Sequence, residues 1–484
     1  MSRHSCPSRA GAVALASGLR TAALCLAGFG LVGLGNPAAA TAQASRCDLR
    51  IQAPSRTSVG VPGGRGIYTT HLGGGTVTLA CGTAVMTGDS AVHYETDQRA
   101  EMIGSVSYRD PTRTLSSNRL TYYETTGQVV ATGDVKLVRL STGARLNGPR
   151  VDFYRGAVPG GITRATGRPH LTIPPEQPGA ESIEVDADVT ELIGEAEAFA
   201  RGNVVIGRSD FQATADSARF TALLGQLYGR PVIRARAIEL VGDSIQTTFA
   251  AGNLDRVHAF GDASARGESI ELDAPRIFVD VGVEDVERIE AFGDGRSLGG
   301  STEFVIAGDS LDFAFTGGEV DSVSAVGRAR AFQLATARDS GADLREPPAE
   351  VSDDQSWIEG DSIRAWFDPP RPPAAGGTGN PRIRRLRSLG DARSFFAAVR
   401  DSTQESRASR NYIIGESIDI GFLDGEPDAV TAIQAIGVFL EPGQGRPARA
   451  ASRPGAPRPG GAAQQQPGGA QQAPPDERES EEPS

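Results

Sequence analysis

A short acidic motif with a serine recurs along the chain, and such a serine could act as a nucleophile. Residues 308–311 read Gly-Asp-Ser-Leu, a string found in serine hydrolases, where a histidine within hydrogen-bond reach activates the hydroxyl. The last histidine of the chain is His258, so none follows Ser310. Gly-Asp-Ser also returns at 88–90, 242–244 and 360–362. Four nucleophiles would serve no purpose, and we interpret the motif as a structural marker at the beginning of a strand, where it supports a turn or bulge.

Other reactive groups are sparse and widely separated. The histidines after the first 44 residues stand at 71, 93, 170 and 258, without the close spacing of metal ligands. Acidic pairs such as Asp273 and Asp280 alternate on outward strand positions, and we interpret them as a solvated face rather than as a general acid and base. No Gly-rich loop precedes a Lys-Ser or Lys-Thr pair, which excludes the common phosphate-binding loop. We therefore expect no enzyme activity, no metal and no cofactor.

Residues 1–44 have the composition of a cleavable secretory signal peptide. Arginines precede a short apolar run at Thr21–Gly35, and A-x-A cleavage candidates follow it. This predicts export to the periplasm, and association with the outer membrane is compatible with it. The chain is acidic, with a net charge of −12 and a single lysine, Lys136, which argues against a nucleic acid partner.

Two cysteines remain after this leader, Cys47 and Cys81. In an oxidising compartment the simplest interpretation is a disulfide between them. Closing this loop would stabilise the fold by about 3–4 kcal/mol on the chain-entropy estimate. Two free buried thiols are the alternative.

The rest of the chain is organised as an internal repeat. One string, A-x-G or a close variant, occurs at 131–133, 165–167, 200–202, 259–261, 291–293, 325–327, 388–390 and 435–437. A second string, Asp-Ser or Glu-Ser, is followed by alternating apolar side chains such as Leu311 and Phe313. Period two predicts strands with one buried face, so Asp312, Arg364 and Asp419 are expected to face outward.

We therefore predict an all-β fold, an elongated β-jellyroll or solenoid-like stack of two-strand repeats with a disordered C-terminal tail. The predicted layout is a signal peptide at 1–44, a lead-in segment at 45–75, a β-repeat region at 76–340, a loop insert at 341–357, further β-repeats at 358–440 with a Pro/Gly loop at 368–383, and a disordered Pro/Gly/Gln-rich tail at 441–484.

The large inward residues of the second string would face the small residues of the first. They either pack together as a core, or leave an apolar slot sized for acyl chains. The candidate lipid-binding residues are Leu120, Tyr122, Phe220, Ile245, Phe249, Ile270, Leu272, Leu311, Phe313, Phe315, Ile363, Phe367, Ile418, Ile420 and Phe422. The middle residue of A-x-G is apolar in later repeats, and its orientation stays open at Phe260, Phe292, Val326, Leu389 and Ile436.

The recurring pattern resembles the OstA-like family, the periplasmic lipopolysaccharide-transport proteins of the LptA type. The segments that carry the resemblance are 70–94, 115–138 and 144–173, the first reading THLGGGTVTLACGTAVMTGDSAVHY. The resemblance implies units stacked into a β-jellyroll that hold lipopolysaccharide or a related glycolipid by its acyl chains and carry it toward the outer membrane. It also implies edge-strand pairing with other β-jellyroll transport proteins, and head-to-tail self-association.

Two alternatives compete with this interpretation. A structural or adhesive secreted β-solenoid would have a fully packed interior and no ligand, but right-handed β-helices have a shorter repeat than the spacing between Gly261, Gly293 and Gly327. A lyase of the β-helix type would cluster Asp, Arg and Lys on one outer face, and lysine is nearly absent here.

Overall fold

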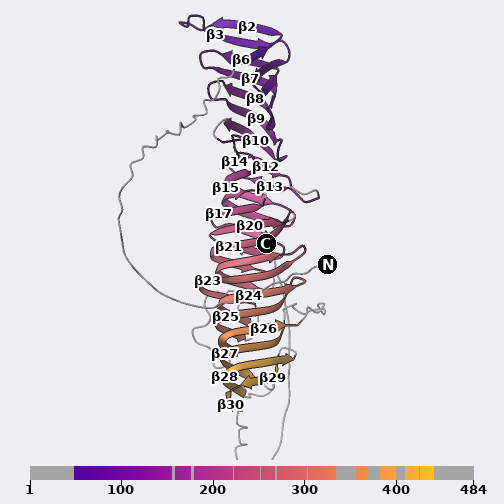
Figure 1. Cartoon of the computed structure of the whole chain (residues 1–484), viewed down its shortest axis with the longest axis vertical. Coiled ribbons are helices and arrows are strands. Elements are labelled where there is room, and N and C mark those ends of the chain that lie inside the picture. The colour runs from indigo at the N-terminus through magenta and orange to yellow at the C-terminus, as the bar shows by residue number, and fades with distance from the viewer. Residues whose placement is uncertain are drawn as a thin grey trace, which may run out of the picture. The chain divides into compact units, whose positions relative to one another are not determined.

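The computed structural model describes residues 48–154, 158–175, 179–221, 223–250, 252–267, 270–301, 304–333, 356–368, 382–398, 409–423 and 426–440 of the 484-residue chain. Every regular element in these ranges is a β-strand, so the predicted all-β class is confirmed (Figure 1). No helix among them is long and apolar enough to cross a membrane. The predicted signal peptide and tail, and most of the two predicted loops, lie outside the described residues. The elongated jellyroll arrangement stays a prediction.

The chain divides into two compact units. The first unit contains the described residues within Met1–Ser141, Asn147–Ala165 and Leu192–Glu195, and the second those within Thr142–Leu146, Thr166–Glu191 and Ala196–Ser484. The chain passes from one unit to the other at five points. Three of them lie within strands, namely β10 (Arg145–Tyr154), β11 (Ile162–Thr166) and β14 (Val189–Ile193), and the other two lie between strands.

The first unit is built from antiparallel strands. Its strands are β1 (Arg50–Gln52), β2 (Ser55–Gly60), β3 (Tyr68–Gly73), β4 (Val77–Cys81), β5 (Ala84–Gly88), β6 (Ser90–Tyr94), β7 (Arg99–Arg109), β8 (Arg113–Tyr123) and β9 (Gln128–Arg139). Strands β5 and β6 pair with the two halves of β7, so they form one long strand interrupted at Asp89. The segment that we assigned as a lead-in already contains β1, β2 and β3.

The second unit continues the same antiparallel pairing. Its strands are β12 (His170–Ile173), β13 (Ile183–Asp186), β15 (Glu197–Gly207), β16 (Phe211–Phe220), β17 (Leu224–Tyr228), β18 (Val232–Ala235), β19 (Ile238–Val241), β20 (Ser244–Ala250), β21 (Asn253–Arg266), β22 (Glu271–Val281), β23 (Val286–Gly300), β24 (Phe304–Thr316), β25 (Glu319–Gln333), β26 (Trp357–Phe367), β27 (Ile383–Ala398), β28 (Ser409–Leu423), β29 (Glu426–Ile433) and β30 (Ile436–Leu440). From β20 to β29 each strand pairs with the next one in the chain, as Figure 1 shows.

Each long strand is bent near its middle, at the A-x-G string. In β15, Gly202 and Asn203 stand opposite a single position of β16, that of Asp216. Their φ angles of 75° and 48° lie in the left-handed region, which glycine adopts freely and asparagine tolerates. The same bulge recurs at Gly261, Gly327 and Gly390. Such a bulge bends the strand, so each strand consists of two arms joined at a corner.

The Gly-Asp-Ser string lies at the same corners. A Cβ added to Gly261 would lie 2.8 Å from Cγ of Asp243, and one added to Gly390 would lie 2.7 Å from Cγ of Asp361. Other pairs of this kind are Gly104 with Asp89, Gly202 with Asp188, Gly229 with Asp216 and Gly327 with Asp309. The aspartate of one strand therefore packs on the corner glycine of the following strand. The prediction that the motif begins a strand is right at 88–90 and 242–244, where β6 and β20 begin at the serine. It was wrong at Asp309 and Asp361, which lie within β24 and β26.

The two arms face each other across an apolar interior. Phe304 and Phe367, from opposite arms, have ring centroids 5.4 Å apart, and Phe211 and Phe249 lie 5.9 Å apart. After the corner of β24 and β26, residues alternate between interior and surface, as the period-two pattern predicted. The first arm of β24, from Phe304 to Gly308, is buried at every residue. Burying one large apolar side chain contributes about 1.5–3 kcal/mol, so the stacked arms supply most of the stability of each unit.

The first unit contains a disulfide-bonded cysteine in this interior. Cys81 is 1% exposed and forms a disulfide, so the alternative of a free thiol at this position was wrong. Its predicted partner, Cys47, lies outside the described residues, and the pairing stays a prediction. The hydroxyl of Tyr122, on β8, donates to Sγ of Cys81 over 2.7 Å.

Candidate functional site

The predicted lipid-binding residues occupy the interior of the two units. Twelve are buried, at most 6% exposed, namely Leu120, Tyr122, Phe220, Ile245, Ile270, Leu272, Leu311, Phe313, Ile363, Phe367, Ile418 and Ile420. Three are half-buried, namely Phe249, Phe315 and Phe422. Their inward orientation agrees with the strand pattern. Close packing accounts for most of them, and lipid contact by this set stays a prediction.

One group of interior residues in the second unit encloses free space. A recess of about 250 Å³ opens among strands β24 to β28, and its lining is Phe304, Ile306, Ala331, Phe332, Ser356, Trp357, Ile358, Ala365, Arg382, Ile383, Leu386, Phe396 and Phe422. At about 30 Å³ per water-sized group, it has room for about eight such groups. Another recess, between Ile233 and Val286, measures about 10 Å³ and holds less than one.

The strand architecture explains the position of this recess. The bulges at Gly327 and Gly390 hold the two arms together at the corner, while the recess lies toward the free ends of the arms. Trp357 is the first residue of β26, and Phe396 lies near the end of β27. Both rings line the open space at these ends of the arms.

The lining of the recess is suited to hydrocarbon. Among its described residues, polar side-chain groups belong to Ser356, Trp357 and Arg382, and the others are apolar. Transfer of a methylene group from water to such a surface is favourable by about 0.8 kcal/mol. The recess can therefore hold a stretch of a single acyl chain, which is less than the multi-chain lipid that a continuous trough would take.

The outer face of the second unit has an aromatic cluster, which shows how the middle residues of the A-x-G string are oriented. Phe260 and Phe292 are half-buried and point away from the interior, because their neighbours Ala259 and Ala291 are fully buried. Phe278 lies between them, with ring centroids 5.9 Å from Phe260 and 4.8 Å from Phe292. Further along the repeat the middle residues are more exposed, at 53% for Val326, 47% for Leu389 and 78% for Ile436.

Ser310 lies on this outer face, paired with Phe292 on one side and Val326 on the other. His258, the histidine nearest to it in sequence, is on β21, three strands from β24. At a strand spacing of about 4.8 Å, the two side chains are roughly 14 Å apart. They are too far apart for a hydrogen bond that would activate the serine.

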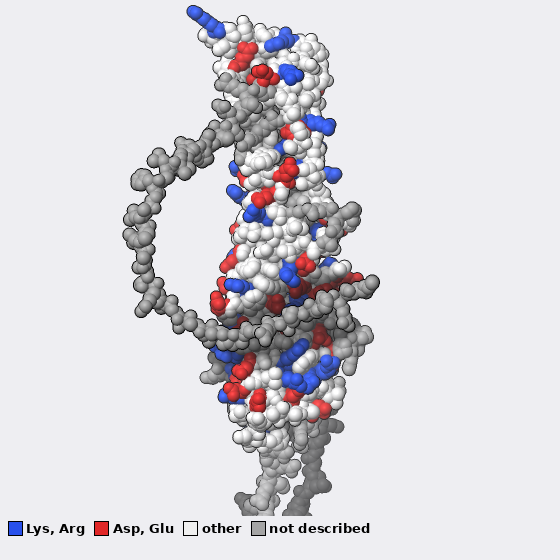
Figure 2. All heavy atoms as spheres, viewed as in Figure 1, with Lys and Arg blue, Asp and Glu red and all other residues white. Residues whose placement is uncertain are grey.

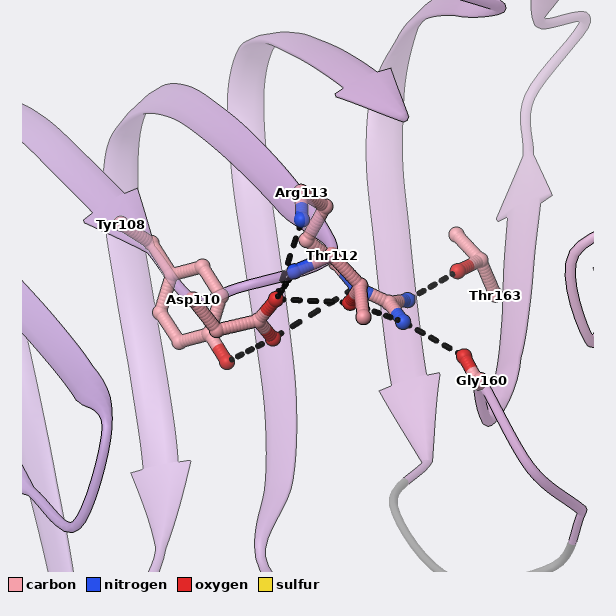
Figure 3. Close-up of polar contacts among 6 residues, drawn as sticks. All are labelled: Tyr108, Asp110, Thr112, Arg113, Gly160 and Thr163. Atoms are coloured by element: carbon pink, nitrogen blue, oxygen red, sulfur yellow. Dashed lines mark hydrogen bonds and ion pairs between the residues drawn. The ribbon is translucent and has the colours of Figure 1, made fainter. Parts of the chain in front are cut away.

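A buried acidic residue in the first unit is the centre of a polar network (Figure 3). Asp110 accepts hydrogen bonds from the Tyr108 hydroxyl over 2.8 Å, the Thr112 hydroxyl over 2.7 Å and the Arg113 backbone N–H over 3.0 Å. Burial raises the pKa of Asp110, but the hydrogen bonds from Thr112 and Tyr108 and the charge of Arg113 outweigh it, so the pKa is lowered from 3.8. The carboxylate therefore stays ionised.

Arg113 extends this network to neighbouring chain segments. Its Nη1 donates to the Thr163 hydroxyl over 2.9 Å, and its Nη2 donates to the Gly160 carbonyl. Its guanidinium also lies over the Phe153 ring, 3.6 Å from the centroid. Each of these polar atoms has a hydrogen-bond partner within the network. We interpret the network as structural, because it connects β8 to β10 and β11.

Charges of both signs are interspersed on the visible surface of each unit (Figure 2). In the second unit, arginines of β27 pair across to β28, where Arg385 and Arg387 donate to Asp419 over 2.6 and 2.7 Å. Hydrogen bonds from Arg385 lower the pKa of Asp419. Arg382 and Arg384, on the same stretch, are exposed and form no ion pair with the described residues.

No protein-family model and no curated protein matches this chain. The lining of the recess was largely missed from the sequence, where Phe422 alone of its residues was predicted. The run Arg-Ile-Arg-Arg-Leu-Arg at 382–387 was a usable signal, because it places arginines beside inward-facing apolar residues.

Proposed function

We propose that this protein binds an amphiphilic lipid by inserting an acyl chain into the recess of the second unit. The observation that carries the proposal is the apolar space of about 250 Å³ between the arms, because a well-packed interior of this kind has few voids larger than a water molecule. Lipopolysaccharide or a related glycolipid is the cargo that the sequence resemblance favours, carried in the periplasm toward the outer membrane.

The proposal is consistent with the energetics of lipid transfer. Each methylene removed from water contributes about 0.8 kcal/mol. A recess with room for about eight groups would therefore offset about 6 kcal/mol of the free energy of exposing one acyl chain to water. Further chains of a multi-chain lipid would need the packed interior along Phe313 and Ile363 to open. We infer that a chain enters first at the recess.

The terminal strands fit the partners that we propose. In the first unit, β2 is exposed at every residue, and among the described strands it pairs with β3. In the second unit, β30 is equally exposed, and among those strands it pairs with β28. Such edges have unused N–H and C=O groups to which another β protein, or a second copy of this chain, can add a strand.

A structural β protein without ligand is the second candidate function. The observation that favours it is the close packing of most of the interior, where residues such as Leu272, Phe313 and Ile418 are fully buried.

Photo-crosslinking separates the two candidates. A benzoylphenylalanine at Phe396, in the recess, is expected to label lipopolysaccharide or a fatty acid, whereas one at Asp312, on the outer face, is expected to label neither. Equal labelling at the two positions, or none at either, would refute lipid binding in the recess and favour the structural role.

A further inference from the structure

A single cation stands among the residues that line the recess. Arg382 contributes to the lining and is exposed to solvent, so it joins the apolar space to the surface. Its backbone carbonyl accepts a hydrogen bond from the N–H of Asp368 over 2.9 Å, which fixes the position of the residue beside the end of β26. The arginine therefore stands where the head group of a lipid would emerge if its chain occupied the recess.

The charge of this arginine is not neutralised by the described residues. The neighbouring arginines Arg385 and Arg387 donate to Asp419, and Arg364 lies over the ring of Trp366. For the guanidinium of Arg382, the described part of the chain provides no hydrogen-bond or ion-pair partner, Asp368 included. A guanidinium has five N–H donors and can bind a carboxylate or phosphate in a bidentate manner.

We propose that the recess takes one acyl chain of an amphiphile with an anionic head group. This chain lies among Phe304, Trp357 and Phe396, and the carboxylate or phosphate of the head group binds Arg382. This inference rests on the proposed function and adds to it the class of ligand and the residue that recognises the head group. The recess has room for one acyl chain, and the positive charge of Arg382 at its border favours a negatively charged head group.

The test is a comparison of ligands on the full chain by isothermal titration calorimetry. Dodecanoate and dodecyl phosphate are the anionic probes, the glycerol monoester of dodecanoate is the neutral probe, and acetate and inorganic phosphate are the anions without a chain. We expect both anionic amphiphiles to bind about tenfold more tightly than the neutral one, and the two small anions not to bind. From octanoate to decanoate the affinity is expected to rise about fourfold per methylene.

Variants separate the head group from the chain. Arg382→Met is expected to weaken binding of dodecanoate about tenfold and to change binding of the neutral ester less than twofold. Arg276→Met, which removes an exposed arginine of β22, is the matched control and should alter neither affinity. Circular dichroism spectra of the variants verify their fold.

The outcomes separate head-group recognition by Arg382 from binding of the acyl chain. If Arg382→Met binds all amphiphiles as the natural sequence does, the assignment of the head group to Arg382 is wrong while chain binding stands. If phosphate alone binds as tightly as dodecyl phosphate, the site is an anion site and the chain inference fails. If no amphiphile binds the natural sequence, the proposed function fails as well.

Discussion

Replacing Gly390 with alanine is expected to destabilise the second unit more than the same replacement at Gly317. Both glycines have positive φ, +74° and +61°, and the left-handed conformation costs an alanine about 1–2 kcal/mol at either position. At Gly317 the added Cβ meets no atom within 4 Å. At Gly390 it would lie 2.7 Å from Cγ and 2.8 Å from Cβ of Asp361, so Asp361 must move, which adds about 1–3 kcal/mol.

Urea unfolding followed by tryptophan fluorescence measures this difference. Trp357 and Trp366 are the two tryptophans of the chain, and both lie on β26, which pairs with β27 where Gly390 is located. The unfolding midpoint of Gly390→Ala is expected to fall well below that of Gly317→Ala. Asp361→Ala in the Gly390→Ala background removes Cγ and the carboxylate but keeps Cβ, so it should recover part of the extra loss. Equal midpoints for the two single variants would refute the argument that the aspartate packs on the corner glycine.

Four other changes have defined consequences. Cys81→Ser is expected to lower the stability of the first unit by about 2–5 kcal/mol, and a reductant should lower the thermal midpoint of the natural sequence but not that of the variant. The folded pKa of Asp110 lies below 3.8, so its ionised form stabilises the fold above pH 3.8. This stability is lost as the pH falls through the lower, folded pKa. Asp110→Asn should remove this pH dependence in an acid titration followed by circular dichroism. Arg113→Met, which leaves that carboxylate buried without its cation, is expected to cost about 3–5 kcal/mol, and a loss below 1 kcal/mol would contradict the network. Asp419→Asn, at an exposed ion pair, should cost less than about 1 kcal/mol in urea.

Local patterns in the sequence were sufficient to predict the strands and their inward faces. Phe313 and Ile363 are buried and Arg364 is exposed, because alternation along a strand is a property of neighbouring residues. The recurrence of A-x-G and Gly-Asp-Ser likewise identified the repeat and excluded Ser310 as a nucleophile.

Contacts between strands could not be predicted in the same way. That Asp361 packs on Gly390 depends on the register of two strands whose contacting residues are far apart in sequence. Phe260 points outward, as strict alternation from the buried Ala259 requires, but the sequence alone left open whether the bulge beside it would turn it inward. The recess was missed for a related reason, since the space near Phe304 and Phe396 depends on how far the arms separate at their free ends.

The central claim, an acyl chain in the recess, is tested most directly by fluorescence quenching with dodecanoate brominated near its methyl end. Trp357 lines the recess, whereas Trp366 lies on the outer face between Arg364 and Arg385. In the Trp366→Phe variant, which retains Trp357, the brominated chain should quench the fluorescence to saturation. In Trp357→Phe, which retains Trp366, it should quench little. Equal quenching in the two variants, or none in either, would contradict the account.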